Sequence, residues 1–172
     1  MKFLSVLSTS LLSALACAPL ASAWSCLSDA DVADIIARQK TFLSRQNVTA
    51  ARAAVATLFS PNLLETSDSI NVLRERPYGV PVYNAETPRY INDTLSEPPL
   101  QALNTVDLLH DCTKIAWYWE MIGVGGPGKP RARGVSIITV DNSQQIISHQ
   151  IEFNSLQWAY NIGYNCTAPA YE

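Results

Sequence analysis

A run of alternating apolar and polar residues constrains the fold of this chain more than any other feature. Between residues 113 and 121, every second side chain on one face is large and apolar: Ile115, Trp117, Trp119 and Met121. A period of two predicts a β-strand with one face in the core and the other toward solvent. Further apolar stretches follow at 134–140, 146–153 and 158–164. Together they predict a meander of antiparallel strands in the C-terminal half.

The N-terminal half carries helix signals instead. Ser28 is followed three residues later by Asp31, which is the pattern of a helix start with a serine cap. Apolar residues at helical spacing then predict an amphipathic helix over residues 29–45. Thr49 can cap a second, alanine-rich helix over 50–59. Helices followed by antiparallel strands predict an α+β domain with the helices on one face of the sheet.

The middle of the chain is rich in proline. A short helix is expected over 69–75, and the next segment, at about 76–100, contains Pro77, Pro81, Pro88, Pro98 and Pro99. This density excludes a central strand or a long helix. The segment is therefore predicted to be a long irregular loop with one short extended piece, and a candidate lid. The glycines of 123–130 predict a hairpin connection rather than a nucleotide site, because no helix follows them.

The first residues have the pattern of a secretory signal peptide. Lys2 precedes an apolar run over 3–20, which closes on the small residues Ala21-Ser22-Ala23. Cleavage before Trp24 would leave residues 24–172 as a single domain. We expect that domain to be secreted or to act in the secretory pathway, where disulfides and N-glycans form.

Charge and hydropathy exclude two classes of partner. The formal net charge is −3, and no basic run with interleaved aromatic residues is present, so a nucleic acid is not expected to bind. After the signal segment there is no apolar stretch of about 18 residues, and residues 168–172 lack the hydrophobic tail of a lipid-anchor signal. We expect no membrane contact once the signal is removed.

Three cysteines remain after loss of the signal: Cys26, Cys112 and Cys166. They allow one internal disulfide with one thiol left over, or three buried free thiols. No Cys-x-x-Cys or Cys/His spacing is present, so no metal site is predicted.

Three Asn-x-Ser/Thr sequons begin at Asn47, Asn92 and Asn165. In a secreted eukaryotic chain they are candidate glycosylation sites at the surface. At Asn165 a disulfide through Cys166 would restrict the local backbone that glycosylation requires.

Four short segments occur in the order found in one known family. Residues 26–29 (Cys-Leu-Ser-Asp) and 67–71 (Ser-Asp-Ser-Ile-Asn) match two of its motifs, and 109–113 (Leu-His-Asp-Cys-Thr) a third. Residues 152–155 (Glu-Phe-Asn-Ser), followed by Trp158, match its Glu-Phe-Asn-Ser…Trp motif. The chain thus resembles secreted fungal proteins of the NTF2-like family, whose fold is also described as a SnoaL-like or cystatin-like cone.

The resemblance implies a curved antiparallel sheet that forms a cone around N-terminal helices, with an apolar pocket at its open end. It also implies that Cys26 pairs with Cys112, because both lie in shared motifs, and that Cys166 is the odd thiol. Many relatives form homodimers through the sheet. The wider fold includes dehydratases, ketosteroid isomerases, polyketide cyclases and plain binding modules, so the fold alone does not decide the function.

A cofactor-free enzyme in such a pocket would need an acid/base pair active near neutral pH. His149 alternates with Ile147 and Ile151 on an apolar strand face, so it either projects into the cone or is a satisfied core histidine. His110 stands at a strand start beside Cys112, where a structural role is favoured.

Carboxylate and hydroxyl candidates complete the set. Asp68 is a candidate general acid, since an apolar cavity raises a carboxyl pKa, although helix capping is the favoured explanation of this residue. Tyr118 or Tyr160 would donate a hydrogen bond to the substrate, and Glu152 is expected to be exposed strand polarity.

The aromatic residues belong either to the core of the sheet or to the lining of a pocket. The candidates for contact with an apolar ligand are Trp117, Trp119, Trp158 and Tyr160. Two functions follow. One is a cofactor-independent dehydratase, isomerase or cyclase acting on an apolar metabolite, for example in secondary metabolism. The other is a secreted, non-catalytic protein that binds a ligand or a host protein. Convergence of Asp68 and a histidine on one cavity would favour the enzyme.

Overall fold

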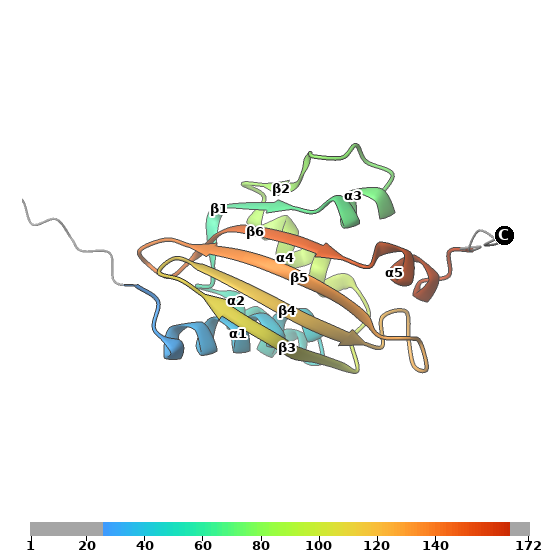
Figure 1. Ribbon diagram of the computed structural model, residues 1–172, viewed down its shortest axis with the longest axis horizontal. Coiled ribbons are helices and arrows are strands. Elements are labelled where there is room, and N and C mark those ends of the chain that lie inside the picture. Colours follow the sequence, from blue (N-terminus) through green and yellow to red (C-terminus); the bar gives the residue numbers. More distant parts are fainter. Residues whose placement is uncertain (1–25, 166–172) are drawn as a thin grey trace, which may run out of the picture.

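A computed structural model describes residues 26–165. A curved six-stranded sheet has the order β2-β1-β6-β5-β4-β3, with helices packed on one face (Figure 1). The strands are β1 (Phe59–Thr66), β2 (Pro81–Asn84), β3 (Ala102–His110), β4 (Lys114–Ile122), β5 (Ala132–Val140) and β6 (Ile146–Phe153). The helices are α1 (Asp29–Ser44), α2 (Val48–Val55), α3 (Asp68–Leu73), α4 (Thr87–Ser96) and α5 (Ser155–Asn161). This architecture confirms the predicted α+β cone. The predicted signal peptide and Cys166 lie outside the described residues.

The first helix forms as its sequence predicts. Ser28 and Asp31 make a reciprocal capping box, in which the Ser28 backbone N–H donates to the Asp31 carboxylate at 2.9 Å. The second helix starts earlier than expected, because the Asn47 side chain accepts the Ala50 N–H at 3.0 Å and takes the capping role assigned to Thr49.

The second helix also ends earlier than expected, because strand β1 begins at Phe59. This strand tolerates Pro61, since the ladder with β6 skips from Phe59 to Leu64 and the proline needs no partner there.

The sheet is mixed rather than wholly antiparallel. Strands β4 to β6 form the first three strands of the predicted antiparallel meander, and β3 adds an antiparallel strand that was not predicted, but β1 pairs with β6 in parallel. Two of these strands cannot be predicted from the hydrophobic pattern. Strand β3 lies at the edge of the sheet and is exposed over most of its length, so it has no apolar alternation. Strand β1 has its alternation interrupted around Pro61.

Two predicted elements are wrong. Residues 158–164 were expected to form a strand, but the chain forms α5 there, capped by the Asn154 side chain, which accepts the Gln157 N–H at 2.9 Å. Trp158 and Ile162 are four residues apart and share one side of this helical segment, so this spacing was mistaken for the alternation of a strand. The segment 76–100 was expected to be an irregular loop with one short extended piece; the four-residue strand β2 fits that piece, but the segment also holds the ten-residue helix α4. Pro88 lies in the first turn of α4, where a missing N–H costs nothing.

The inner face of the sheet is tightly filled. The buried face predicted for β4 is confirmed in full: Ile115, Trp117, Trp119 and Met121. A Cβ atom on Gly134 would overlap the Trp119 ring, so glycine opposite tryptophan lets the ring lie flat on β5. Phe42 of α1 packs edge-on against Phe59 of β1, with ring centroids 5.5 Å apart, and joins the helix layer to the sheet.

The implied Cys26–Cys112 disulfide is present and ties the start of α1 to the turn between β3 and β4. Beside it, the Leu27 N–H donates to the Cys112 carbonyl at 3.1 Å. Over residues 26–165, no helix is both long and apolar enough to cross a membrane.

Replacing Cys112 by serine should lower the free energy of unfolding by about 3–5 kcal/mol, because the bond joins residues 86 apart in the sequence and restricts the unfolded chain. Urea denaturation without reductant measures the loss. The single variants Cys26→Ser and Cys112→Ser and the double variant should lose the same amount. Singles as stable as the wild type would contradict this expectation.

Candidate functional site

A cavity of about 230 Å³ lies between the inner face of the sheet and the helices. Its apolar wall comes from the sheet and α5: Trp119, Met121, Ile151, Phe153, Trp158 and Ile162. Its opposite wall, from α1, α3, α4, β1 and β2, is more polar and includes Arg45, Glu65, Arg74, Tyr83, Tyr90 and Glu97. The cavity therefore combines an apolar surface with a few polar groups, as small-molecule sites do.

One row of side chains crosses the sheet at the inner end of this cavity. In the strand ladders, Glu65 lies opposite Tyr83 of β2 on one side and His149 of β6 on the other, and His149 faces Ile138 of β5. The parallel pairing of β1 and β6 thus brings a carboxylate and an imidazole side by side on the buried face.

The Glu65–His149 pair is almost fully enclosed. The Oε2 atom of Glu65 lies 3.5 Å from Nδ1 of His149, and the two residues are 1% and 0% exposed. Within residues 26–165, neither this oxygen nor either ring nitrogen has a hydrogen-bond partner. Burying a lone carboxylate is very costly, so the adjacent imidazole is the group that makes the position tolerable. Glu65 lines the cavity, whereas His149 does not.

A buried phenol stands close to this pair. The ring of Tyr90, from α4, packs edge-on against Phe42 and Phe59, with centroids 5.5 and 5.2 Å away. Its hydroxyl finds no hydrogen-bond partner in the described part of the chain. Burial, helped by the nearby Glu65 carboxylate, raises the pKa of Tyr90 well above its usual range. The phenol therefore keeps its proton and can donate it in a hydrogen bond.

The apolar wall is held in place by its own hydrogen bonds. The Trp119 indole N–H donates to Ser136 Oγ at 3.0 Å, so the ring presents only its apolar surface to the cavity. The rings of Phe153 and Trp158 stack with centroids 4.8 Å apart. Helix α5 is anchored by the Asn161 side-chain N–H₂, which donates to the Pro130 carbonyl at 2.7 Å.

Charged side chains mark the open side of the cavity. Among the lining residues, Arg74, Glu97 and Ile162 are exposed to solvent. Partial burial raises the pKa of Glu97 above its usual range.

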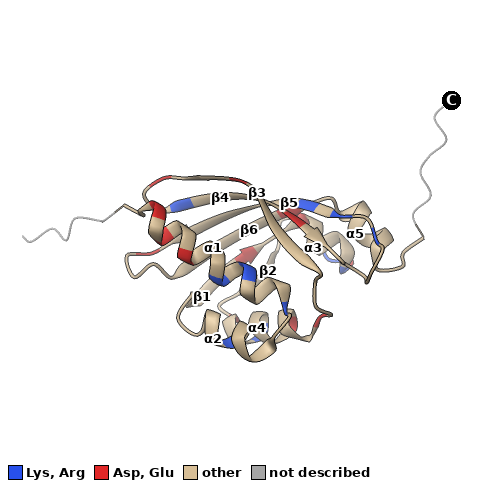
Figure 2. Cartoon of the chain, turned by 90° about the horizontal axis from the view of Figure 1, so that it is seen from below, with Lys and Arg blue, Asp and Glu red and all other residues tan. Residues whose placement is uncertain are grey.

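In α1, acidic residues gather at the start and basic ones toward the end, where Arg45 follows (Figure 2).

Asp68 and His149, the proton-transfer candidates from the sequence, do not meet. Asp68 is the exposed first residue of α3, and its carboxylate accepts the Gly79 N–H at 2.7 Å, outside the cavity lining. The α3 cap is Ser67, whose hydroxyl accepts the Ile70 N–H at 3.0 Å. Ile147, expected on the face of His149, is 37% exposed because a register shift in the β5–β6 ladder turns it outward.

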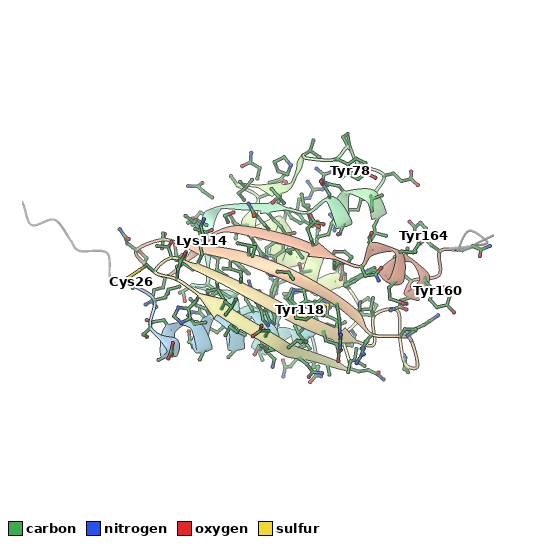
Figure 3. All side chains as sticks on the ribbon, in the orientation of Figure 1. Cys26, Tyr78, Lys114, Tyr118, Tyr160 and Tyr164 are labelled. Carbon is green, nitrogen blue, oxygen red and sulfur yellow. A yellow bond between two sulfur atoms is a disulfide. The ribbon has the colours of Figure 1, made fainter. Side chains whose placement is uncertain are left out.

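Of the aromatic candidates, Trp119 and Trp158 line the cavity. Trp117 is fully buried beside it, with its indole N–H donating to Thr105 Oγ1 at 3.0 Å. Tyr118 alternates onto the outer face of β4, and Tyr160 is 53% exposed on α5 (Figure 3). Neither tyrosine lines the cavity.

The remaining candidates lie at the surface. Glu152 is exposed but structural, since its carboxylate accepts the backbone N–H of Asp68 at 2.8 Å and of Ser69 at 3.1 Å, fixing the start of α3 on β6. The sequon residues Asn47, Asn92 and Asn165 are exposed, and their glycosylation stays a prediction.

Sequence reasoning missed Glu65 and Tyr90. Both belong to elements that the pattern did not predict, β1 and α4. The one available signal was the carboxylate of Glu65 directly after the two leucines at 63 and 64. Over the described range, no cluster of three or more His, Cys, Asp or Glu side chains could hold a metal ion.

The family model described as an NTF2-like domain matches residues 25–165. No functionally curated protein matches the chain. Among solved structures, a loop-truncation variant of IdmH is 16% identical, covering 76% of this chain and 98% of its own, with a TM-score of 0.56. A SnoaL-like protein of unknown function from Burkholderia thailandensis is 11% identical, covering 75% and 98%, with a TM-score of 0.56. A steroid delta-isomerase from Pseudomonas aeruginosa is 14% identical, covering 81% and 93%, with a TM-score of 0.53. At these identities the similarity shows a common fold.

The Glu65–His149 contact can be tested with a double-mutant cycle. His149→Leu leaves a buried carboxylate without its partner and should cost about 3–5 kcal/mol of stability. Adding Glu65→Leu should recover most of that loss, because the uncompensated charge is gone. Urea denaturation of the wild type, both singles and the double gives the coupling energy. Gln150→Leu, at an exposed position of β6, is the control and should change little. Additive effects of the two substitutions would refute the contact.

His110 also has a testable protonation behaviour. Its Nε2 atom lies 2.9 Å from the Asp29 carboxylate, and this hydrogen bond raises the pKa of His110 above its usual range. The resulting stabilisation is present below about pH 6.5 and is lost as the pH rises through the folded-state pKa. An NMR titration should show the raised pKa, and Asp29→Asn should lower it. Asp34→Asn, elsewhere on α1, should leave it unchanged. Equal His110 pKa values in the wild type and Asp29→Asn would contradict this reading.

Proposed function

This chain belongs to the NTF2-like domain family, and we propose that its cavity binds a small apolar molecule and catalyses cofactor-independent proton transfer on it. The observation that carries the proposal is the position of Glu65, a buried carboxylate that lines a cavity whose facing wall is apolar. A carboxylate in such surroundings is a suitable general base or acid. The steroid delta-isomerase name borne by one structural neighbour agrees with this reaction class.

Each polar group has a defined part in the proposed reaction. Glu65 removes a proton from the carbon next to a carbonyl group, and the electron pair of the C–H bond moves to the carbonyl oxygen. The Tyr90 hydroxyl donates a hydrogen bond to that oxygen, whose negative charge grows in the transition state. His149 lies behind Glu65, with its Nδ1 atom 3.5 Å from the Glu65 Oε2 atom, and holds the carboxylate in position. In a β,γ-unsaturated substrate, return of the proton to the γ-carbon moves the double bond and gives an isomer. In a β-hydroxy substrate, the proton held by Glu65 passes to the β-hydroxyl group, which leaves as water and gives a dehydrated product.

The proposal changes the assignments made from the sequence. Asp68 and Tyr118 are replaced by Glu65 and Tyr90, because the former two do not line the cavity. Trp119 and Trp158 are retained as ligand-contacting residues. We further propose that residues 1–23 direct the protein to the secretory pathway, with which the disulfide is compatible.

A non-catalytic ligand-binding role is the second candidate. It is favoured by the burial of the Glu65–His149 pair, whose members lie against each other. In that role the pair would position an uncharged polar group of the ligand and would transfer no proton.

Hydrogen exchange on a simple ketone distinguishes the two roles without knowledge of the natural substrate. The probe is 2-tetralone in D₂O, a bicyclic ketone with acidic α-hydrogens, and ¹H NMR measures the rate at which they exchange. We expect the wild type to accelerate exchange, and Glu65→Gln to lower the enzymatic rate by about 10²- to 10⁴-fold. Tyr90→Phe should lower it by a smaller factor, because the oxyanion loses a donor but the base remains.

Asp68→Asn is the matched control, an exposed carboxylate outside the cavity, and should exchange the probe at the wild-type rate. Binding of 2-tetralone by the wild type without faster exchange would favour the non-catalytic role. Exchange that survives Glu65→Gln unchanged would refute Glu65 as the base.

A further inference from the structure

Two arginines line the polar wall of the cavity, and only one of them is neutralised. Arg45 follows α1 and is 7% exposed; its Nε–H donates to the Pro98 carbonyl at 2.9 Å. Its Nη1 atom lies 3.6 Å from the Glu97 carboxylate. Arg45 and Glu97 therefore form a charge-balanced pair in the wall.

Arg74 is different. It ends α3 at the open side of the cavity, and its Nη1–H donates to the Tyr83 hydroxyl at 3.3 Å. The guanidinium lies over the Tyr83 ring, 5.7 Å from its centroid. The Tyr83 hydroxyl in turn donates to Asp93 at 2.7 Å, and Asp93 is 3.6 Å from Arg89. In the described part of the chain, Arg74 makes no ion pair of its own, so its positive charge remains available.

The charges of the cavity wall fix where an anion can bind. Glu65 stands at the inner end with His149 as its partner, and Glu97 is paired with Arg45. At the open side, the mouth of the cavity, Arg74 is then the lining cation without an ion pair in the described chain, although Glu97 and Asp93 still act on it at longer range. A negative group on a ligand would be attracted to the mouth and repelled from the Glu65 end, since like charges at short range repel strongly in a partly buried site. The apolar body would then extend along Trp119 toward Glu65.

We propose that the natural ligand is an apolar carboxylic acid, held by its carboxylate at Arg74 with its ring or chain in the cavity. A planar guanidinium matches a carboxylate because two parallel N–H groups can donate to its two oxygens. The Tyr83 ring supports the guanidinium from one face and limits its rotation. This inference rests on the proposed function only in taking the cavity as the binding site. It adds an orientation, in which the carboxylate end of the ligand stays at the open side of the cavity.

Two probes of nearly the same shape test it. 2-Naphthoate carries a carboxylate, and 2-naphthamide replaces it with a neutral amide; isothermal titration calorimetry at pH 7 measures the Kd of each. We expect the wild type to bind the acid at least tenfold more tightly, because hydrogen bonds to a charged group are the stronger kind. Arg74→Met should remove this preference while leaving the Kd of the amide within about twofold. Arg74→Lys should keep part of the preference, since the charge remains but the two-donor geometry is lost.

Arg89→Met is the matched control. Arg89 lies 5.9 Å from the centroid of the same Tyr83 ring, but it is paired with Glu86 and Asp93 and does not line the cavity. Its loss should not change the preference for the acid.

The outcomes separate this inference from the proposed function. Equal binding of acid and amide by the wild type, or an unchanged preference in Arg74→Met, would overturn the role of Arg74 and leave the cavity as a ligand site. Failure of both naphthyl probes to bind a protein that binds 2-tetralone would overturn the inference alone, whereas failure of all three to bind would overturn the proposed function as well.

Discussion

The parallel contact between β1 and β6 is the interaction on which the rest of this structure depends. It adds the β1–β2 pair to an otherwise antiparallel meander, and so extends the sheet over the helices of the inner face. Its register also sets Glu65 beside His149. Figure 1 shows β1 running next to β6. A shift of one residue would turn the carboxylate to the outer face and replace it with Leu64 or Thr66, according to the direction of the shift. The fold and the candidate chemistry therefore share one determinant.

The candidate site lowers the stability of the fold. An apolar cavity forgoes the packing contacts that a filled core would make. The buried oxygen of Glu65, both nitrogens of His149 and the Tyr90 hydroxyl have no hydrogen-bond partners within residues 26–165. Buried polar groups are paired in most protein interiors, and departures gather where a ligand is to be bound. Elsewhere the chain compensates with the Cys26–Cys112 disulfide and with close packing such as Trp119 on Gly134.

Sequence patterns predicted the parts of the fold that depend on local order. The capping box of α1 depends only on Ser28 and Asp31, and the alternation of β4 lies within one short segment. Both elements could therefore be predicted from the sequence. Strand β1 and helix α4 were missed, because Pro61 and Pro88 look disruptive until their tolerated positions are known. The residues of the site were only partly predicted for the same reason. Trp119 lies on a recognisable strand, whereas Glu65 acquires its neighbour only through the non-local β1–β6 pairing.

The most direct test of this account is to locate a bound small molecule on the protein. Methyl-labelled protein titrated with 2-tetralone and followed by NMR would report contacts at isoleucine and methionine side chains. The account predicts shifts at Ile70, Met121 and Ile151, which line the cavity, and none at Ile137 and Ile147 outside it. Shifts confined to the outer face of the sheet, or no shifts at saturating probe, would contradict the claim that this cavity is the functional site.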